Sequence, residues 1–206
     1  NIDTIITPFT DVEFTNLKPD LLITFGGMVV SKRIKAFLRK YKPEHHWHID
    51  ELRGYDTYGC LTKHFKVNPN RFFNEFLPLT HAVQSNYFNS FDTITKLRKT
   101  KHHDYLSRIP FSDFKAFELI IPSLPKNCSL HLSNSSPIRY AQLVDIDYSI
   151  SVFCNRGTSG IDGSTSTAIG SAVANELQTV LIAGDIGFLY DSNALWNNYI
   201  PKNFKI

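Results

Sequence analysis

A glycine and an aspartate follow the apolar run 179–183, which is the strongest strand pattern in the chain. At the end of a parallel strand, Gly184 and Asp185 would lie at the sheet edge where α/β proteins bind their ligands. The glycine lets the backbone approach a phosphate closely, and the carboxylate supplies the oxygen ligand that Mg²⁺ prefers. The pattern predicts a site for a metal-bound phosphate. The alternative is an aspartate that only begins the next helix.

A second candidate is the segment 155–163, which follows a strand pattern at 151–154. It holds three glycines within seven positions, at Gly157, Gly160 and Gly163. Glycines allow close backbone approach, and hydroxyls and N–H groups before a helix suit an anion. Arg156, at the base of the segment, could form a forked pair with a carboxylate. We therefore expect an anion-binding loop, with a tight turn that binds nothing as the alternative.

Histidines and cysteines give weaker signals. On a strand over 45–49, His46 and His48 share one face, but no third ligand stands at a matching spacing, so a metal site is not expected there. Cys60, Cys128 and Cys154 form neither a disulfide framework nor a zinc pattern, which suits a reducing cytoplasm. A serine nucleophile is not indicated, because the segment 157–160 lacks the G-x-S-x-G register.

Strand and helix patterns alternate along the chain and position these candidates. The strand patterns cover 21–25, 45–49, 64–67, 129–132, 151–154 and 179–183. Helix patterns cover 31–41, 69–76, 112–121, 138–144, 164–174 and roughly 188–196. Residues 1–18 are interpreted as a connector, and 79–95 are left unassigned. The alternation predicts an α/β fold, a Rossmann-like three-layer arrangement of a parallel sheet flanked by helices on both faces.

Composition excludes several classes of protein. Of the 206 residues 42% are hydrophobic and 20% charged, enough apolar content for a folded core rather than a disordered chain. The excess of 22 Lys and Arg over 19 Asp and Glu gives a net charge of +3, too small to indicate nucleic-acid binding. Apolar runs are about five residues long, against roughly 20 for a membrane-spanning helix, so no membrane span is expected.

The two glycine-containing segments together resemble the MenD family, the 2-succinyl-5-enolpyruvyl-6-hydroxy-3-cyclohexene-1-carboxylate synthases, which use thiamine diphosphate. The resemblance rests on Asn155-Arg-Gly-Thr-Ser-Gly-Ile-Asp-Gly-Ser-Thr-Ser-Thr-Ala168 and Ala183-Gly-Asp-Ile-Gly-Phe-Leu-Tyr-Asp-Ser-Asn-Ala-Leu195. It is looser over 1–130, where it rests on Gly26-Gly27, Ser31-Lys32-Arg33 and the Trp47/Asp50 segment. It implies a central α/β domain at 1–140, followed at 141–206 by the truncated N-terminal part of the cofactor-binding domain.

The resemblance implies a role for each matching residue. Asp185 resembles the ligand of the Mg²⁺ that holds the cofactor diphosphate, and Ile186 stands where most of the superfamily has a third glycine. Ile161 resembles the bulky residue wedged beneath the cofactor. The implied cofactor-binding residues are Gly160, Ile161, Gly184, Asp185 and Ile186, and the implied substrate-binding residues are Lys32, Arg33, Ser135, Arg139 and Arg156.

The family's reaction decarboxylates 2-oxoglutarate on thiamine diphosphate and adds the product to isochorismate, a transferase step in menaquinone (vitamin K2) biosynthesis. The resemblance implies Mg²⁺, and a parent that is a homodimer or homotetramer. The cut-looking ends suggest an excised piece. The family's catalytic glutamate belongs to an N-terminal domain, so we expect no catalytic residue here and no synthase activity from these 206 residues alone.

Two other interpretations stay open. One is a non-catalytic nucleotide- or dinucleotide-binding module, suggested by Gly26-Gly27 after a strand, although a G-x-G-x-x-G fingerprint is missing. The other is a structural domain whose ancestral cofactor pocket has been lost. Titration of the full-length protein with thiamine diphosphate and Mg²⁺, and separately with NAD, would distinguish the three.

Overall fold

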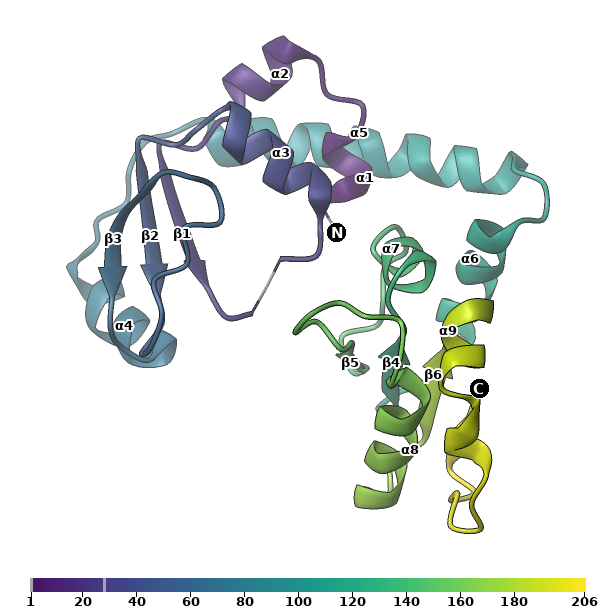
Figure 1. Ribbon diagram of the computed structural model, residues 1–206. Helices are drawn as coiled ribbons and strands as arrows, with labels where there is room; N and C mark the ends of the chain where they lie inside the picture. Colours follow the sequence, from purple (N-terminus) through teal and green to yellow (C-terminus); the bar gives the residue numbers. More distant parts are fainter. Residues whose placement is uncertain (1, 28) are drawn as a thin grey trace. The chain divides into compact units, whose positions relative to one another are not determined.

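A computed structural model describes residues 2–27 and 29–206, and its elements are labelled in Figure 1. Within the described residues the chain divides into two compact units, Ile2–Asp104 and Tyr105–Ile206. Each contains a parallel β-sheet with helices packed beside it. The α/β fold class predicted from the sequence is therefore confirmed, with two separate sheets.

The first unit is built on a three-stranded parallel sheet of order β1-β2-β3. Its strands are β1 (Leu21–Phe25), β2 (His45–Ile49) and β3 (Leu61–Phe65). Helix α3 (Lys32–Lys40) connects β1 to β2, and the Ser31 hydroxyl caps it by accepting from the Ile34 N–H at 3.0 Å. The two predicted strands 21–25 and 45–49 have the predicted bounds. The third lies at 61–65, where 64–67 was predicted.

Aromatic side chains gather on one face of this sheet. The Trp47 ring lies 5.3 Å from that of Phe65 and 5.9 Å from that of Phe76, in edge-to-face geometry. Helix α4 (Pro69–Phe76) supplies Phe72 and Phe76, and Asn68 caps it as predicted. The aromatic side chains between residues 65 and 76 thus pack against one another on this sheet.

The connector predicted for residues 1–18 is wrong, because two short helices, α1 (Asp3–Ile6) and α2 (Asp11–Asn16), form there. A capping box starts α2, since Thr10 accepts from the Glu13 N–H while the Glu13 carboxylate accepts from the Thr10 N–H. Ile5, Ile6, Phe9 and Leu17 form a buried cluster around these helices. Tertiary packing stabilises elements too short to be helical alone.

The segment left unassigned contains the start of the longest helix, α5 (Tyr87–Arg108), which follows a 3₁₀ turn η1 (Leu77–Leu79). Polar and aromatic residues are spread around this helix, so no apolar stripe of helical period marks it. Phe91 and Ile94 pack against the cluster of Ile5, Ile6, Phe9 and Leu17. The Tyr87 hydroxyl donates to the Leu17 carbonyl at 3.1 Å, which fixes the N-terminal half of α5 within the first unit.

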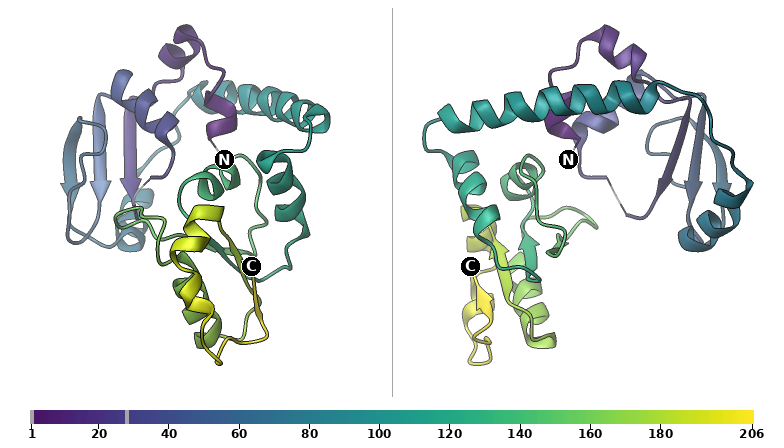
Figure 2. Two further views of the ribbon diagram at one scale, coloured as in Figure 1. Left: turned by 45° about the vertical axis from the view of Figure 1, so that its right-hand side comes forward. Right: turned by 180° about the vertical axis from the view of Figure 1, so that it is seen from behind.

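The second unit is built on a four-stranded parallel sheet of order β5-β4-β6-β7. Helix α7 connects β4 to its neighbour β5, and α8 connects β5 back past β4 to β6. These two connections run in opposite directions across the sheet, and right-handed crossovers place two such helices on opposite faces. Helix α8 lies along β6 in Figure 2, with Ala168, Ile169 and Ala172 packed on Leu181. The elements are β4 (Ser129–Leu132), α7 (Ser136–Ala141), β5 (Ser151–Phe153), α8 (Ser164–Ala174), β6 (Thr179–Ile182) and β7 (Phe204–Lys205).

Three further elements complete the second unit: α6 (Asp113–Ser123), α9 (Asp185–Tyr190) and the 3₁₀ turn η2 (Ser192–Leu195). Predicted bounds differ at helix ends. Pro122 lies inside α6 rather than after it, α7 begins at Ser136, and α9 begins at Asp185 instead of near 188. The compact units divide at Asp104/Tyr105, and β4 pairs within the second sheet. The domain boundary near 140 stays a prediction, because a division by contacts does not define a family's domains.

Helices in the described part of the chain are too short or too polar to cross a membrane. The three cysteines are free thiols, of which Cys128 is buried.

Candidate functional site

A cavity of about 530 Å³ lies in the second unit, at the carboxyl ends of β4 and β6. This is the sheet edge where ligands of parallel α/β folds bind, and the volume is within the range of small-molecule sites. Five residues predicted as site residues line it: Ser135, Ile161, Gly184, Asp185 and Ile186. Other lining residues come from α6 and α7, among them Asp113, Phe117, Pro137 and Tyr140, and Asn134 lines it from the turn between β4 and α7.

Strand β6 delivers Gly184 and Asp185 to this cavity. Gly184 is the N-cap of α9, and its N–H donates to the Ser133 hydroxyl at 3.2 Å, which joins the ends of β6 and β4. Asp185 begins α9 and is exposed, so its carboxylate is open to a ligand in the cavity. The sequence pattern of strand, glycine and aspartate therefore does place a free carboxylate at the predicted sheet edge.

The segment 155–163 is held by one buried side chain that the sequence reasoning missed. The Asn134 amide N–H groups donate to the carbonyls of Asn155 at 2.7 Å and Gly160 at 2.6 Å. Its oxygen accepts from Arg156 Nη1 at 2.6 Å. Asn134 directly follows β4 and precedes the predicted Ser135, and that position at a strand end was the signal that could have identified it.

Ser135 has φ 74° and ψ −124°, a backbone conformation that side-chain-bearing residues rarely adopt. Its neighbours hold it there, because Ser133 accepts from Gly184 and Asn134 is bonded to the segment 155–163. Such conformations cost about 1–3 kcal/mol and persist only where the surroundings fix them. The conformation turns the chain sharply between β4 and α7 and leaves Ser135 exposed at the cavity.

The segment 155–163 and α9 approach each other closely over Ile161. A methyl group at Gly187 would lie 3.2 Å from the Ile161 carbonyl oxygen, which is tighter than ordinary van der Waals contact. Ile161 lines the cavity and is only partly exposed, whereas Ile186 is 54% exposed. The glycine thus lets an apolar side chain from one segment stand beside the aspartate from another.

Three predicted substrate-binding residues are not among the residues of the second unit that line the cavity. Arg139 is an exposed residue of α7 and does not line the cavity. Lys32 and Arg33 form the exposed first turn of α3 in the other unit. Arg156 does not line the cavity either, but it contacts the lining residue Asn134. Substrate binding by Lys32, Arg33, Arg139 and Arg156 stays a prediction.

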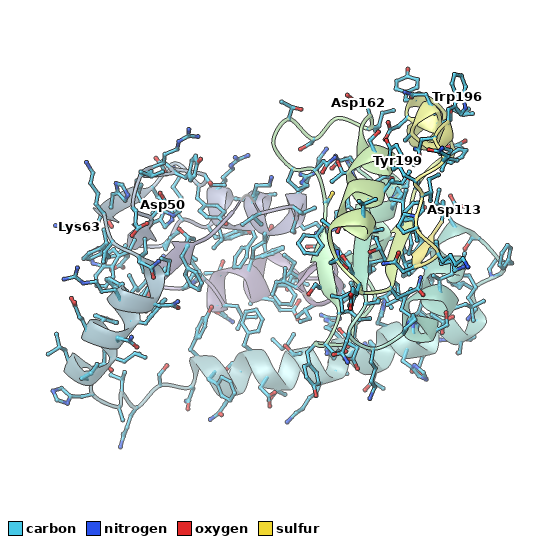
Figure 3. All side chains as sticks on the ribbon, turned by 90° about the horizontal axis from the view of Figure 1, so that it is seen from below. Asp50, Lys63, Asp113, Asp162, Trp196 and Tyr199 are labelled. Atoms are coloured by element: carbon cyan, nitrogen blue, oxygen red, sulfur yellow. The ribbon has the colours of Figure 1, made fainter. Side chains whose placement is uncertain are left out.

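The donor set suits a metal-bound phosphate better than a bare anion. Asp113 and Asp185 both line the cavity, so two carboxylates give its polar lining negative charge. Figure 3 labels Asp113 at the start of α6, and Asp162, which lies on the segment 155–163. Among the described residues no group of three His, Cys, Asp or Glu side chains could hold a metal by itself. Mg²⁺ commonly binds one or two carboxylates and completes its shell with phosphate oxygens and water, and the cavity fits that pattern.

Burial shifts the pKa of a thiol near the cavity and of two histidines in the first unit. Burial raises the pKa of the Cys154 thiol, against the opposing effect of Arg156, so the thiol stays protonated near neutral pH. In the first unit the Thr24 hydroxyl bonds His46 Nε2 at 2.8 Å and His48 Nδ1 at 2.9 Å, and burial lowers the pKa of both rings. These histidines are packed in the core of the first unit.

Comparison with known proteins gives close relatives over the whole chain. It is 68% identical over 206 residues to the 2-succinyl-5-enolpyruvyl-6-hydroxy-3-cyclohexene-1-carboxylate synthase of Flavobacterium psychrophilum, covering 100% of this chain and 38% of that protein. The proteins of that name from Flavobacterium johnsoniae and Christiangramia forsetii are 67% and 54% identical, with 37% and 36% of their lengths covered. The chain therefore spans less than two fifths of these relatives. No protein-family model matches it.

Proposed function

The chain belongs to the family of 2-succinyl-5-enolpyruvyl-6-hydroxy-3-cyclohexene-1-carboxylate synthases, and from that premise we propose that its cavity binds thiamine diphosphate with Mg²⁺. The observation that supports this most directly is the exposed Asp185 carboxylate, which lines a cavity of about 530 Å³ at the carboxyl end of a parallel sheet. When bound, the cofactor supplies the electron sink for decarboxylation of a 2-oxo acid.

In this proposal the chain's own residues bind and orient. Asp185 provides one oxygen ligand to Mg²⁺, and the backbone at Gly184 leaves room for the diphosphate. The Ser135 hydroxyl, exposed at the same cavity, offers a hydrogen bond to an anionic group. Ile161 and Ile186 would offer the cofactor apolar contacts from the wall of the cavity. These side chains do not transfer protons, and the catalytic acid–base groups would come from elsewhere in the protein.

The substrates that we propose for the whole protein are 2-oxoglutarate and isochorismate, with the reaction in menaquinone biosynthesis. Both substrates carry carboxylates, and a guanidinium such as that of Arg156 can bind a carboxylate through two parallel hydrogen bonds. Arg156 Nε is buried without a hydrogen-bond partner, so a donor remains for such a group. We further propose a cytoplasmic protein that functions as a homodimer or homotetramer.

The test is turnover of 2-oxoglutarate and isochorismate by the full-length protein. Product formation should require both substrates, thiamine diphosphate and Mg²⁺, and chelation of the metal should abolish it reversibly. NAD in place of thiamine diphosphate serves as the control for a dinucleotide-binding protein. Failure to form the condensation product with all components present would contradict the proposed function.

A further inference from the structure

Asn134 combines deep burial with an unusual number of hydrogen bonds. It is 3% exposed. Its two N–H donations go to the Asn155 and Gly160 carbonyls, and its oxygen accepts from Arg156 Nη1 and, at 3.4 Å, from the Cys154 thiol. Every partner lies in one segment, 154–160, which is some 20 residues farther along the chain. One amide therefore binds both ends of that segment at once.

This pairing fixes the course of the segment. Asn155 and Gly160 are five positions apart, and carbonyls bonded to one nitrogen atom must lie close together. The intervening residues are then confined to a closed loop, and Ile161 leaves that loop directly after the second anchor. Loss of the amide would release two partly buried carbonyls and the loop they close.

The same amide sets the orientation of Arg156. Nη1 donates to Asn134, Nε is buried without a partner, and no carboxylate pairs with this guanidinium in the described part of the chain. The guanidinium thus contacts a neutral amide oxygen and the Cys154 thiol, whose pKa burial raises, so its positive charge is not neutralised by these partners. A carboxylate at that position would neutralise the arginine, whereas an amide holds it without doing so.

We propose that Asn134 is a positioning residue that closes the loop 155–160 and holds Arg156 ready to bind an acidic substrate. The inference rests on the proposed function for its substrate. The first part of the proposal, that the Asn134 amide closes the loop, does not depend on the enzymatic activity of the protein.

The experiment compares Asn134→Ala, Arg156→Ala and the double variant in the full-length protein, with Asn203→Ala as the matched control. Asn203 also donates its amide to main-chain carbonyls, but at the opposite end of the same sheet. Two quantities are measured: hydrogen exchange of the amides of residues 157–163, and the KM of each acidic substrate. If Asn134 closes the loop, its loss speeds amide exchange in the loop alone, whereas a general loss of stability speeds exchange throughout the protein.

Asn134→Ala should accelerate exchange in residues 157–163 at least about tenfold and raise the KM of at least one acidic substrate about tenfold. Adding Asn134→Ala to Arg156→Ala should change that KM less than about twofold, because Asn134 affects substrate binding through Arg156. Asn203→Ala should leave both quantities unchanged. Unaltered loop exchange in Asn134→Ala, or additive KM effects in the double variant, would overturn the proposal.

Asn134→Asp provides a second variant of almost the same shape if the alanine variant does not fold. The aspartate keeps an oxygen that can accept from Arg156, but its second oxygen cannot donate to the carbonyls of Asn155 and Gly160. The loop should therefore still open, and its amides should exchange faster. Protection equal to that of the wild type would contradict the role of the amide. A protein without synthase activity would contradict the proposed function alone, and loop exchange would still decide whether Asn134 closes the loop.

Discussion

Both ends of the four-stranded sheet contain an asparagine whose side-chain amide binds several carbonyls of the main chain. At the amino end, Asn203 Nδ2 donates to the carbonyls of Ala172, Asn175 and Leu177 at 2.9–3.3 Å. At the carboxyl end, Asn134 Nδ2 donates to the carbonyls of Asn155 and Gly160. The same chemical group thus organises two loops on opposite edges of one sheet.

The surroundings of the two asparagines differ. Around Asn203 the main chain is paired further, since its own carbonyl accepts from Thr179 N at 2.8 Å and Gln178 Nε2 at 2.7 Å. Around Asn134 lie a strained serine, a buried guanidinium nitrogen without a partner, and the cavity with Asp185. At the amino end the asparagine and the carbonyls around it are paired with one another, whereas at the carboxyl end the described residues include a buried nitrogen without a partner and an exposed carboxylate.

The largest difference in substrate affinity should come from the arginine present only at the carboxyl end. Arg156→Ala removes the guanidinium and should raise the KM of an acidic substrate roughly 10- to 100-fold, as expected for a charged hydrogen bond. Arg156→Lys should recover only part of the loss, because an ammonium cannot form two parallel bonds. Steady-state kinetics of the full-length protein would check this. Wild-type KM values in both variants would remove Arg156 from the substrate site.

At the amino end the opposite pattern is expected. Asn203→Ala leaves three carbonyls without their donor and should lower the free energy of unfolding by about 1–3 kcal/mol. Affinity for thiamine diphosphate should be unchanged, because the cavity lies at the other edge of the sheet. Urea unfolding and cofactor titration of the same preparation measure both. If Asn203→Ala lost affinity for thiamine diphosphate while its free energy of unfolding stayed unchanged, the proposed difference between the two ends of the sheet would be wrong.

Two buried histidines of the three-stranded sheet, His46 and His48, extend the comparison to that sheet. Burial lowers the pKa of His46 and His48 in the folded state, so the unfolded chain binds more protons as the pH falls. Their contribution to stability is full above the ordinary pKa of 6.5 and is lost progressively as the pH drops below it. Urea unfolding followed by tryptophan fluorescence at pH 7.5 and 5.5 should show this loss. His46→Gln should reduce the pH dependence, while His45→Gln, at an exposed position, should not.

The smallest effect is expected at Ser135. Ser135→Gly relieves the positive φ of 74° and should stabilise the protein by about 0.5–1 kcal/mol, the strain recovered less the entropy cost of glycine. Thermal unfolding would detect the gain. The matched control Ser136→Gly, in the first turn of α7, should be destabilising instead, because glycine weakens a helix. A destabilised Ser135→Gly variant would show that the hydroxyl contributes more than the strain costs.

Sequence patterns predicted the elements with strong local signals. The strands at 21–25 and 45–49 and the helix capped by Asn68 were predicted with the observed bounds, because continuous apolar runs and capping side chains act locally. The long helix α5 escaped prediction because it lacks an apolar stripe of helical period. Helices α1 and α2 escaped because they are short and depend on a capping box and on packing.

For the candidate site, too, local sequence patterns located some residues, while contacts between distant residues could not be predicted. A strand followed by Gly184-Asp185 indicated its own sheet edge, and family resemblance added Ser135 and Ile161, which line the same cavity. The role of Asn134 was not visible, because its partners lie some 20 residues away and meet it only once β4 and β5 are paired. The strain at Ser135 has the same origin, since the fold rather than the residue type imposes it.

The central claim is that the Asp185 carboxylate holds Mg²⁺ for a diphosphate at the carboxyl end of the sheet. Calorimetric titration of the full-length protein with thiamine diphosphate, in the presence and absence of Mg²⁺, tests it most directly. We predict Mg²⁺-dependent binding that Asp185→Asn weakens about 100-fold or more, since even the loss of an outer partner of a metal ligand costs 10- to 100-fold. Equal affinities of the wild type and Asp185→Asn would contradict the claim.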